Sequence, residues 1–412
     1  MRWEGYVRIA VLVLGLVTPV AAQSSLELVG FGMVQPVPGI VSQGIGGITT
    51  VPGGTQEWLY STPSTWHQIR ATQLHVALAS GETRLGDLGT YNRAGLQNFQ
   101  FLIHANRRTS YGVGIQPVTR VDLALRDSTG VDILGQDTIR YVQDRSSEGG
   151  ISAFKLGFSR RIGPAVSLGV SLDILFGSLV QSDELRFSDK GGRDDLFNMF
   201  AERRLEFSGQ RLALSLLAAV PPKSKGWLGI KAVLPLTLKL IEVQHYYGLS
   251  RSIPPLRHGD VGSPASIVVG YGMDIALKHR VMAEAGFSRL LKAAKNDIVF
   301  GRHLKETRSL RVGWSRIPSG DEAWFIGRLY YHMGFYRKVY YLSVSKNDPL
   351  AEFAFSAGIG FRSRGFGHRV DFAIQIGRRD GLFDVQFEDF YRLSVGVTTT
   401  ELWFMRPNKR WD

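Results

Sequence analysis

The stretch Ala-Val-Ser-Leu-Gly-Val-Ser-Leu-Asp-Ile-Leu-Phe at residues 165–176 decides the fold of this chain. Its even-numbered residues are large and apolar, whereas Ser167, Gly169, Ser171 and Asp173 between them are small or polar. Successive side chains of a β-strand point to opposite faces, so the stretch predicts a strand with one apolar face and one small or polar face.

The same alternation returns further along the chain. It occupies residues 265–277, 352–361 and 369–377, with shorter versions at 99–103, 111–115, 154–158, 310–314 and 393–397. Less regular runs lie near 66–80, 227–242, 280–290, 323–337 and 338–346. Together they predict an all-β chain with about 14 strands, each of about 9 to 13 residues.

Alternation alone does not separate a soluble β-sandwich from a membrane barrel, because both have one apolar face per strand. Two features favour the barrel. The strands are long enough for a tilted crossing of a bilayer, and aromatic residues crowd near strand ends, as between Trp324 and Tyr341. We therefore predict a transmembrane antiparallel β-barrel.

The N-terminus predicts export. Arg2 and Arg8 precede an apolar run from Ile9 to Val20, and the small residues Ala21 and Ala22 follow. The run is about 12 residues long, shorter than the roughly 20 that a spanning helix needs, so a cleaved signal peptide at residues 1–22 is favoured over a membrane anchor. The predicted location is the outer membrane of the cell.

Residues 23–64 differ from the rest of the chain. They are rich in Gly and Pro and lack sustained alternation. We interpret this segment as a hatch, or plug, inside a barrel formed by residues 65–412. Polar stretches near 127–150, 179–210, 243–263, 291–306 and 378–389 are expected to be long outer loops, because barrels of this kind have short turns at the periplasmic end.

Composition argues against other classes. The chain has no cysteine, and its net charge of +13 comes from Lys and Arg residues that are scattered in sequence, so no nucleic-acid partner is expected. The motifs of serine hydrolases, zinc proteases and nucleotide-binding loops do not occur. We expect no enzyme, no metal and no cofactor; a lipase built from residues distant in sequence is the remaining enzymatic alternative.

Short motifs at both ends resemble those of a known family. Ser42-Gln43-Gly44-Ile45-Gly46-Gly47 resembles the start of FadL-like outer membrane proteins, which include long-chain fatty-acid channels and PorV-type proteins of the type IX secretion system. The end, Glu401 to Asp412, resembles the terminus of barrels from Bacteroidota. The family pattern Asn-Pro-Ala is Thr62-Pro63-Ser64 here, so the match is partial. The resemblance implies 14 strands, a luminal hatch and a lateral route for hydrophobic molecules.

Three groups of candidate residues follow. Gly44, Gly46, Gly47 and Pro63 are the hatch candidates, since glycine permits turns and close backbone approach. Gly114 and Pro117 are candidates for a lateral opening, because Pro117 removes a hydrogen-bond donor within a strand; an ordinary bulge is the alternative. Trp403 and Phe404 are candidates for a C-terminal insertion signal.

The predicted function is passive uptake of hydrophobic small molecules such as long-chain fatty acids. The alternative is a PorV-like docking component of type IX secretion, and a barrel with a structural role alone is a third possibility. Expected partners are outer membrane lipids, the barrel-assembly machinery, and either a hydrophobic small molecule or secretion-system proteins.

Overall fold

The structure is a computed structural model of the whole chain. It describes residues 33–35, 39–54, 59–85, 89–134, 137–189, 198–220, 226–247, 256–260, 264–276, 278–290, 306–318, 324–343, 349–363, 368–381 and 386–401. The predicted signal peptide at residues 1–22 and the candidates Trp403 and Phe404 lie outside the described residues.

The wall is a closed antiparallel β-barrel of 14 strands, which confirms the predicted fold class. Twelve positions in the ring are single strands: β2 (Thr72–Leu85), β3 (Thr90–Asn106), β6 (Asp137–Arg161), β7 (Val166–Asp189), β8 (Met199–Val220), β9 (Gly226–Tyr247), β12 (His279–Leu290), β13 (Thr307–Arg316), β14 (Tyr330–Ser343), β15 (Pro349–Arg362), β16 (Arg369–Asp380) and β17 (Phe387–Glu401). Two positions hold two pieces each, β4 (Thr109–Pro117) with β5 (Thr119–Leu134), and β10 (Leu256–Asp260) with β11 (Pro264–Ala276). Pairing of β17 with β2 closes the ring.

In the part of the barrel that crosses the membrane, the apolar faces of the strands point outward, as a bilayer requires. On β7, Leu168, Val170 and Phe176 are 36% to 43% exposed, whereas Ser171 and Asp173 on the inner face are no more than 2% exposed. The interior of the barrel is therefore lined by small and polar side chains, which leaves room for other parts of the chain.

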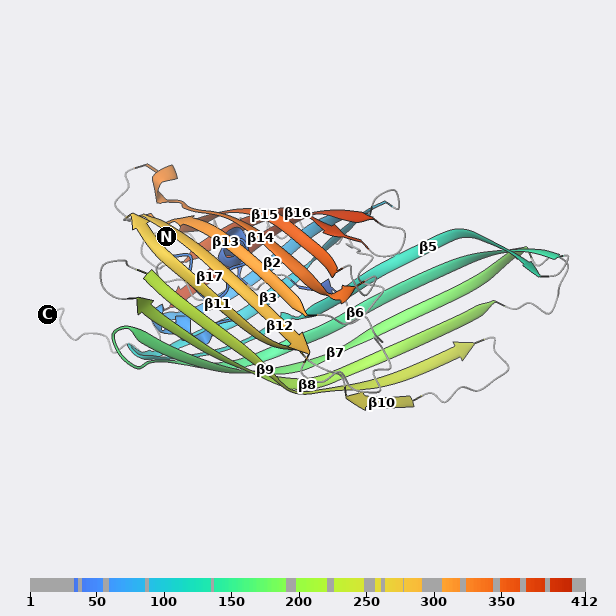
Figure 1. Cartoon of the computed structure of the whole chain (residues 1–412), viewed down its shortest axis with the longest axis horizontal. Helices are drawn as coiled ribbons and strands as arrows, with labels where there is room; N and C mark the ends of the chain where they lie inside the picture. Colours follow the sequence, from blue (N-terminus) through green and yellow to red (C-terminus); the bar gives the residue numbers. More distant parts are fainter. Residues whose placement is uncertain are drawn as a thin grey trace.

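That room is taken by residues 39–69, which we call the luminal segment; residues 55–58 within it are not described. It contains a short helix, α2 (Ile40–Gly44), and a 3-10 helix, η2 (Pro63–Gln68). Its apolar side chains, such as Ile45 and Trp66, are fully buried. Figure 1 shows the segment, in dark blue, surrounded by the strands. The first wall strand begins at Thr72, so residues 65–69 lie with the luminal segment and not with the wall.

Four neighbouring strands are much longer than the predicted 9 to 13 residues. Strands β6 and β7 have 25 and 24 residues, and β8 and β9 have 22 each. Together with β5 they extend far beyond the rest of the barrel (Figure 1). The prediction of loops near 127–150 and 179–210 was therefore wrong, because most of these residues lie in strands whose outer face is polar. We call this part of the wall the extension.

The two ends of the barrel have different connections. Strands β3 and β4, β6 and β7, and β11 and β12 are joined at one end by short turns. At the same end, a longer connection before β14 carries the 3-10 helix η4 (Ile326–Arg328). Short turns are typical of the periplasmic end of such barrels, so we assign this end to the periplasm. A two-residue strand, β1 (Met33–Val34), pairs with the start of β5. Among the described residues, no helix is long and apolar enough to cross a membrane.

Candidate functional site

The luminal segment is held to the wall by a buried carboxylate on β12. Glu284 accepts hydrogen bonds from the backbone N–H groups of Thr49 and Thr50, both at 2.7 Å, and from the Thr50 hydroxyl at 2.7 Å. Arg311 on β13 forms an ion pair with the same carboxylate. Hydrogen bonds to a charged acceptor are the strong ones, so Glu284 is a principal anchor of the segment.

Further anchors lie elsewhere around the ring. On β15, Ser356 Oγ accepts a hydrogen bond from the N–H of Gly46 at 2.9 Å and donates one to the carbonyl oxygen of Gly44 at 3.1 Å. On β8, Ser215 Oγ accepts a hydrogen bond from the N–H of Ser64 at 3.0 Å. The luminal segment is thus fixed to several sides of the barrel at once.

The four hatch candidates all lie in this segment, and Gly44, Gly46 and Pro63 lie against the wall. Gly46 and Gly47 have φ angles of +78° and +79°, and a Cβ on Gly46 would lie 2.8 Å from a carbonyl oxygen of β14. Gly44 packs against Gly358 of β15, and Pro63 packs against Gly169 of β7. The backbone of the luminal segment therefore contacts the backbone of the wall directly, and only glycine permits so close an approach.

Beside the luminal segment, the inner face of the extension carries a cluster of buried apolar side chains, which we call the inner apolar cluster. Its members come from β5 to β9, with Val118 packed against them: Val121, Ile151, Ala153, Leu175, Leu179, Leu205, Phe207, Leu238 and Leu240. On β8 the alternation is inverted here, because Leu205 and Phe207 point inward while Glu206 and Ser208 are exposed outside. This part of the wall therefore packs its apolar side chains together on the inner face.

A cation-rich group adjoins the inner apolar cluster, and on β6 and β7 its members lie one inward position from Ala153 and Leu175. Asp173 on β7 forms ion pairs with Lys155 on β6 at 2.6 Å and with Arg211 on β8 at 2.7 Å. Lys231 on β9 is close enough to interact electrostatically with Lys155 and Arg211. Asp173 thus faces cations from β6, β8 and β9, and the anchor carboxylate Glu284 also interacts electrostatically with Lys231.

Tyr60 connects this cation-rich group to the luminal segment. The ring of Tyr60 lies 5.4 Å from the Lys155 ammonium, and its hydroxyl would lie 2.7 Å from a Cβ on Gly114 of β4. Burial, with a smaller contribution from the charge of Asp173, raises the pKa of Tyr60 well above its ordinary value. The phenol is therefore neutral, and it caps the group without adding charge. Gly114, a lateral-opening candidate, provides the space for this ring.

The wall is interrupted between β4 and β5, at Val118. Strand β4 pairs with β3 on one side and with β6 on the other, and its last residue is the candidate Pro117. From Thr119 onward, β5 pairs with β6 and, over two residues, with β1. Among the described residues no ladder joins β5 to β3, whose residues 90–98 pair with β2 alone. We call this interruption the wall break.

Glycines next to the wall break let the long strands bend. Gly149 and Gly150 on β6 have φ angles of +117° and +140°, and Gly177 on β7 has a φ of +154°. A Cβ on Gly150 would collide with the carbonyl oxygen of Thr119. Non-glycine residues rarely adopt such angles, so the bend requires glycine at these positions. At the wall break itself, the N–H of Val118 donates a hydrogen bond to the carbonyl oxygen of Ile151 on β6 at 2.7 Å.

Sequence reasoning identified the neighbourhood of the break but missed the residues beside it. Gly114 lies next to Tyr60, and Pro117 lies next to Val118. The sequence had indicated Asp173 only as part of a polar strand face. The missed signals were the inverted alternation from Arg204 to Ser208 and the pair Gly149-Gly150. In the described residues, no group of three or more His, Asp or Glu side chains is arranged to hold a metal ion.

Solved structures with the same fold include a hydrocarbon channel, a FadL homologue and a toluene transporter. The CymD monoaromatic hydrocarbon channel is 14% identical with a TM-score of 0.59, over 92% of this chain and all of that chain. A Pseudomonas aeruginosa FadL homologue is 12% identical with a TM-score of 0.59, over 89% and 99%. The Ralstonia pickettii toluene transporter TbuX is 14% identical with a TM-score of 0.54, over 90% and 98%.

These likenesses establish a FadL-type barrel fold, and a closed barrel with an apolar outer surface is an outer membrane structure. No curated protein matches the sequence. The family model named BamG matches residues 6–234, which is more than half of the 412 residues. The chain therefore belongs to the BamG family.

Proposed function

We propose that this barrel passes hydrophobic molecules with an anionic head group, of the fatty-acid type, from the outside into the outer membrane. The observation that carries the proposal is the position of the inner apolar cluster, which adjoins both the wall break at Val118 and the cation-rich group of Lys155, Arg211 and Lys231. An apolar tail and a carboxylate would each find a matching surface there.

The luminal segment favours a lateral route over a straight one. Passage along the barrel axis would require release of the hydrogen bonds that Glu284, Ser356 and Ser215 make with the segment. A molecule leaving between β3 and β5 would meet, among the described ladders, the two-residue pairing of β1 with β5. The segment would then act as a hatch that remains closed while the ligand leaves through the wall.

The surplus of positive charge favours an acid over a neutral hydrocarbon. The two carboxylates of this region, Asp173 and Glu284, face four cations, which are Lys155, Arg211, Lys231 and Arg311. Water is largely excluded because the side chains of Lys155 and Asp173 are no more than 3% exposed. Charged hydrogen bonds in such surroundings contribute about 1.5–3 kcal/mol each. Two of the solved proteins named above are a monoaromatic hydrocarbon channel and a toluene transporter, so binding measurements should compare a fatty acid with an aromatic hydrocarbon.

Binding of a long-chain fatty acid, its methyl ester and toluene to the purified barrel tests the proposal. We expect the acid to bind about tenfold more tightly than the ester, from one charged hydrogen bond. The Lys231→Met variant should lower this preference, whereas Lys239→Met, which removes an exposed lysine from the outer face of the same strand, should leave it unchanged. Absence of binding by all three compounds would contradict the proposal.

Two predictions from the sequence remain open. A docking role in type IX secretion gains no support from the arrangement of residues described here and stays a prediction. Insertion by the barrel-assembly machinery fits the fold of the chain. A deletion strain that loses secretion of cargo proteins but keeps fatty-acid uptake would favour the docking role.

A further inference from the structure

Exposed arginines that are apart in sequence meet at the short-turn end of the barrel. Arg107 and Arg108 form the turn between β3 and β4, and Arg160 and Arg161 end β6. The two turns touch, since the N–H of Arg161 donates to the carbonyl of Arg108 at 2.8 Å. Arginines that are scattered in the sequence are thus clustered in space. We call Arg107, Arg108, Arg160 and Arg161 the arginine rim.

The arginine rim is not neutralised by acids. No Asp or Glu occurs in the sequence between residues 99 and 121 or between 149 and 172, which form the strands around the rim. Within the described ranges, none of the four arginines forms an ion pair with a carboxylate. Arg161 donates instead to the carbonyl oxygens of Gly163 and Pro164, at 2.9 and 2.6 Å, and so supports its own turn. Arg107, Arg108 and Arg160 remain exposed to an external anion.

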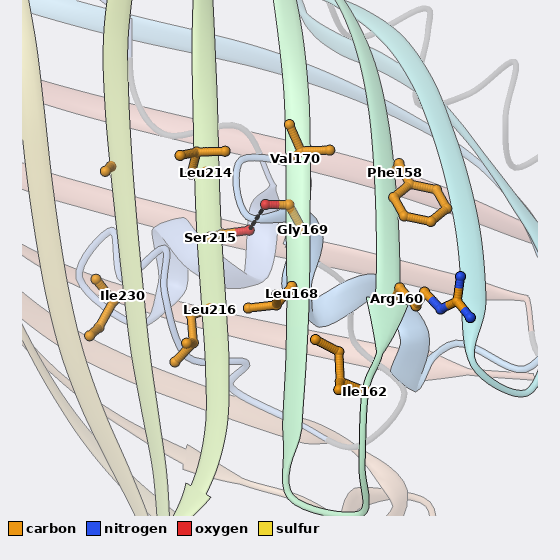
Figure 2. A pocket seen from close by; sticks show the side chains of 11 residues that line it. Phe158, Arg160, Ile162, Leu168, Gly169, Val170, Leu214, Ser215, Leu216 and Ile230 are labelled. Atoms are coloured by element: carbon orange, nitrogen blue, oxygen red, sulfur yellow. Dashed lines mark hydrogen bonds between the residues drawn. The ribbon is translucent and has the colours of Figure 1, made fainter.

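A groove of about 490 Å³ opens on the lipid-facing surface beside the rim. Figure 2 shows it between strands β6 and β9, with Arg160 and Ile162 toward the turn and Val170 and Leu214 further along the wall. Leu168 and Leu216 lie between them. Its lining is almost wholly apolar, and its size falls within the roughly 300–1,000 Å³ of small-molecule sites. An apolar chain that enters from the membrane would fit this surface.

We infer that the groove and the arginine rim together form a binding site for an anionic phospholipid of the periplasmic leaflet. One acyl chain lies in the groove, and the phosphate lies against Arg160, Arg107 and Arg108. The short-turn end is the periplasmic end, so the rim lies at the height of those head groups. Guanidinium groups bind phosphate through paired hydrogen bonds, and a membrane lipid reaches the groove without crossing water.

This site is separate from the proposed transport route, because it lies on the outer surface of the wall. It would fix the orientation of β6–β9, the strands that carry the extension, relative to the membrane. Loss of fatty-acid binding in the lumen would leave it untouched, and loss of lipid binding here would leave the inner apolar cluster unchanged.

The test is native mass spectrometry of the purified barrel from mixed micelles that contain equal amounts of phosphatidylglycerol and phosphatidylcholine. We expect the wild-type protein to retain phosphatidylglycerol preferentially. The triple variant Arg107→Gln, Arg108→Gln, Arg160→Gln should lose about 125-fold of this preference, since each basic side chain near an anionic surface contributes about fivefold. Arg161 is kept because it supports its turn.

Two further variants separate the parts of the site. Ala232→Trp, which fills the groove, should reduce retention of both lipids while the barrel stays folded, as judged by its heat-dependent migration in gels. Arg289→Gln with Arg308→Gln, which removes two exposed arginines at the opposite end, should change nothing. Equal retention of both lipids by the wild type, or an unchanged preference in the triple variant, would overturn the inference.

Discussion

The short strands β11 to β17 and the long strands β6 to β9 differ in where their apolar side chains point. Strands β11 to β17 have 10 to 15 residues and expose apolar side chains such as Phe355 and Ile359 to lipid. Strands β6 to β9 also expose apolar side chains to lipid in the part near the short-turn end. In the extension, on the other side of Gly149 and Gly177, their apolar residues point inward. The same strand can thus be a membrane wall along one part of its length and a binding surface along another.

The largest effect is expected from the anchor on the short side. Glu284→Ala leaves Arg311 and two backbone N–H groups without their acceptor. Removal of one partner from a buried ion pair costs about 3–5 kcal/mol, so the unfolding free energy in urea should fall by that amount, and ion conductance across planar bilayers should rise. Glu306→Gln, which changes a surface ion pair of Arg289, is the control and should stay within about 0.5 kcal/mol.

A pair of phenylalanines separates the inner and outer roles directly. Phe207 is 4% exposed in the inner apolar cluster, and Phe355 is 64% exposed on the lipid-facing surface. Phe207→Ala should lower the unfolding free energy by about 3 kcal/mol and weaken ligand binding, because it opens a cavity in a packed cluster. Phe355→Ala should cost less than about 1 kcal/mol and leave binding unchanged. Equal effects of the two variants would refute the inverted arrangement.

The bend between the two parts should tolerate side chains poorly. Gly150→Val forces a β-branched residue to a φ of +140° and against the carbonyl of Thr119, so we expect a loss of about 1–3 kcal/mol in the unfolding free energy. Gly163→Ala, in a turn where a Cβ would meet no atom within 4 Å, should have almost no effect. If both variants were equally stable, the bend would not depend on these glycines.

The smallest effect concerns pH and the luminal segment. Burial lowers the pKa of His67 below its ordinary value of 6.5, and the carbonyl of Ser64 lies 2.8 Å from its Nδ1. A lowered pKa in the folded protein means that the unfolded chain binds the proton more readily, so stability present above about pH 6.5 is lost as the pH falls further. Urea unfolding at several pH values should show this trend, and His67→Gln should weaken it.

The sequence predicted the barrel because alternation over ten residues has one simple physical cause, a surface with different media on its two sides. Val166 to Phe176 is such a case, and its outward residues lie where they were expected. The hatch glycines were proposed from local chemistry, and their role as a hatch stays a prediction. The extension was missed because Arg204 to Gln210 alternate with the opposite sense, and polar outward residues resemble a loop when no membrane boundary is known.

The site itself could not be assembled from the sequence. Lys155, Asp173 and Arg211 lie on three different strands, and only the register of the ladders brings them together. Tyr60 meets Lys155 because the luminal segment folds back into the barrel, which no periodicity reports. The positions of Gly114 and Pro117 beside the break were accessible, since a proline inside a good strand interrupts hydrogen bonding wherever it occurs.

A reversible lock across the wall break tests the lateral route most directly. The chain has no cysteine, and the Arg120 guanidinium packs against Gly95 of β3, so Gly95→Cys with Arg120→Cys offers a clean pair for a short thiol cross-linker that can be cleaved by reducing agent. We predict that the cross-linked barrel in liposomes still binds the fatty acid but no longer delivers it to the bilayer, and that cleavage of the cross-link restores delivery. Delivery at an unchanged rate through the locked barrel would contradict the lateral route.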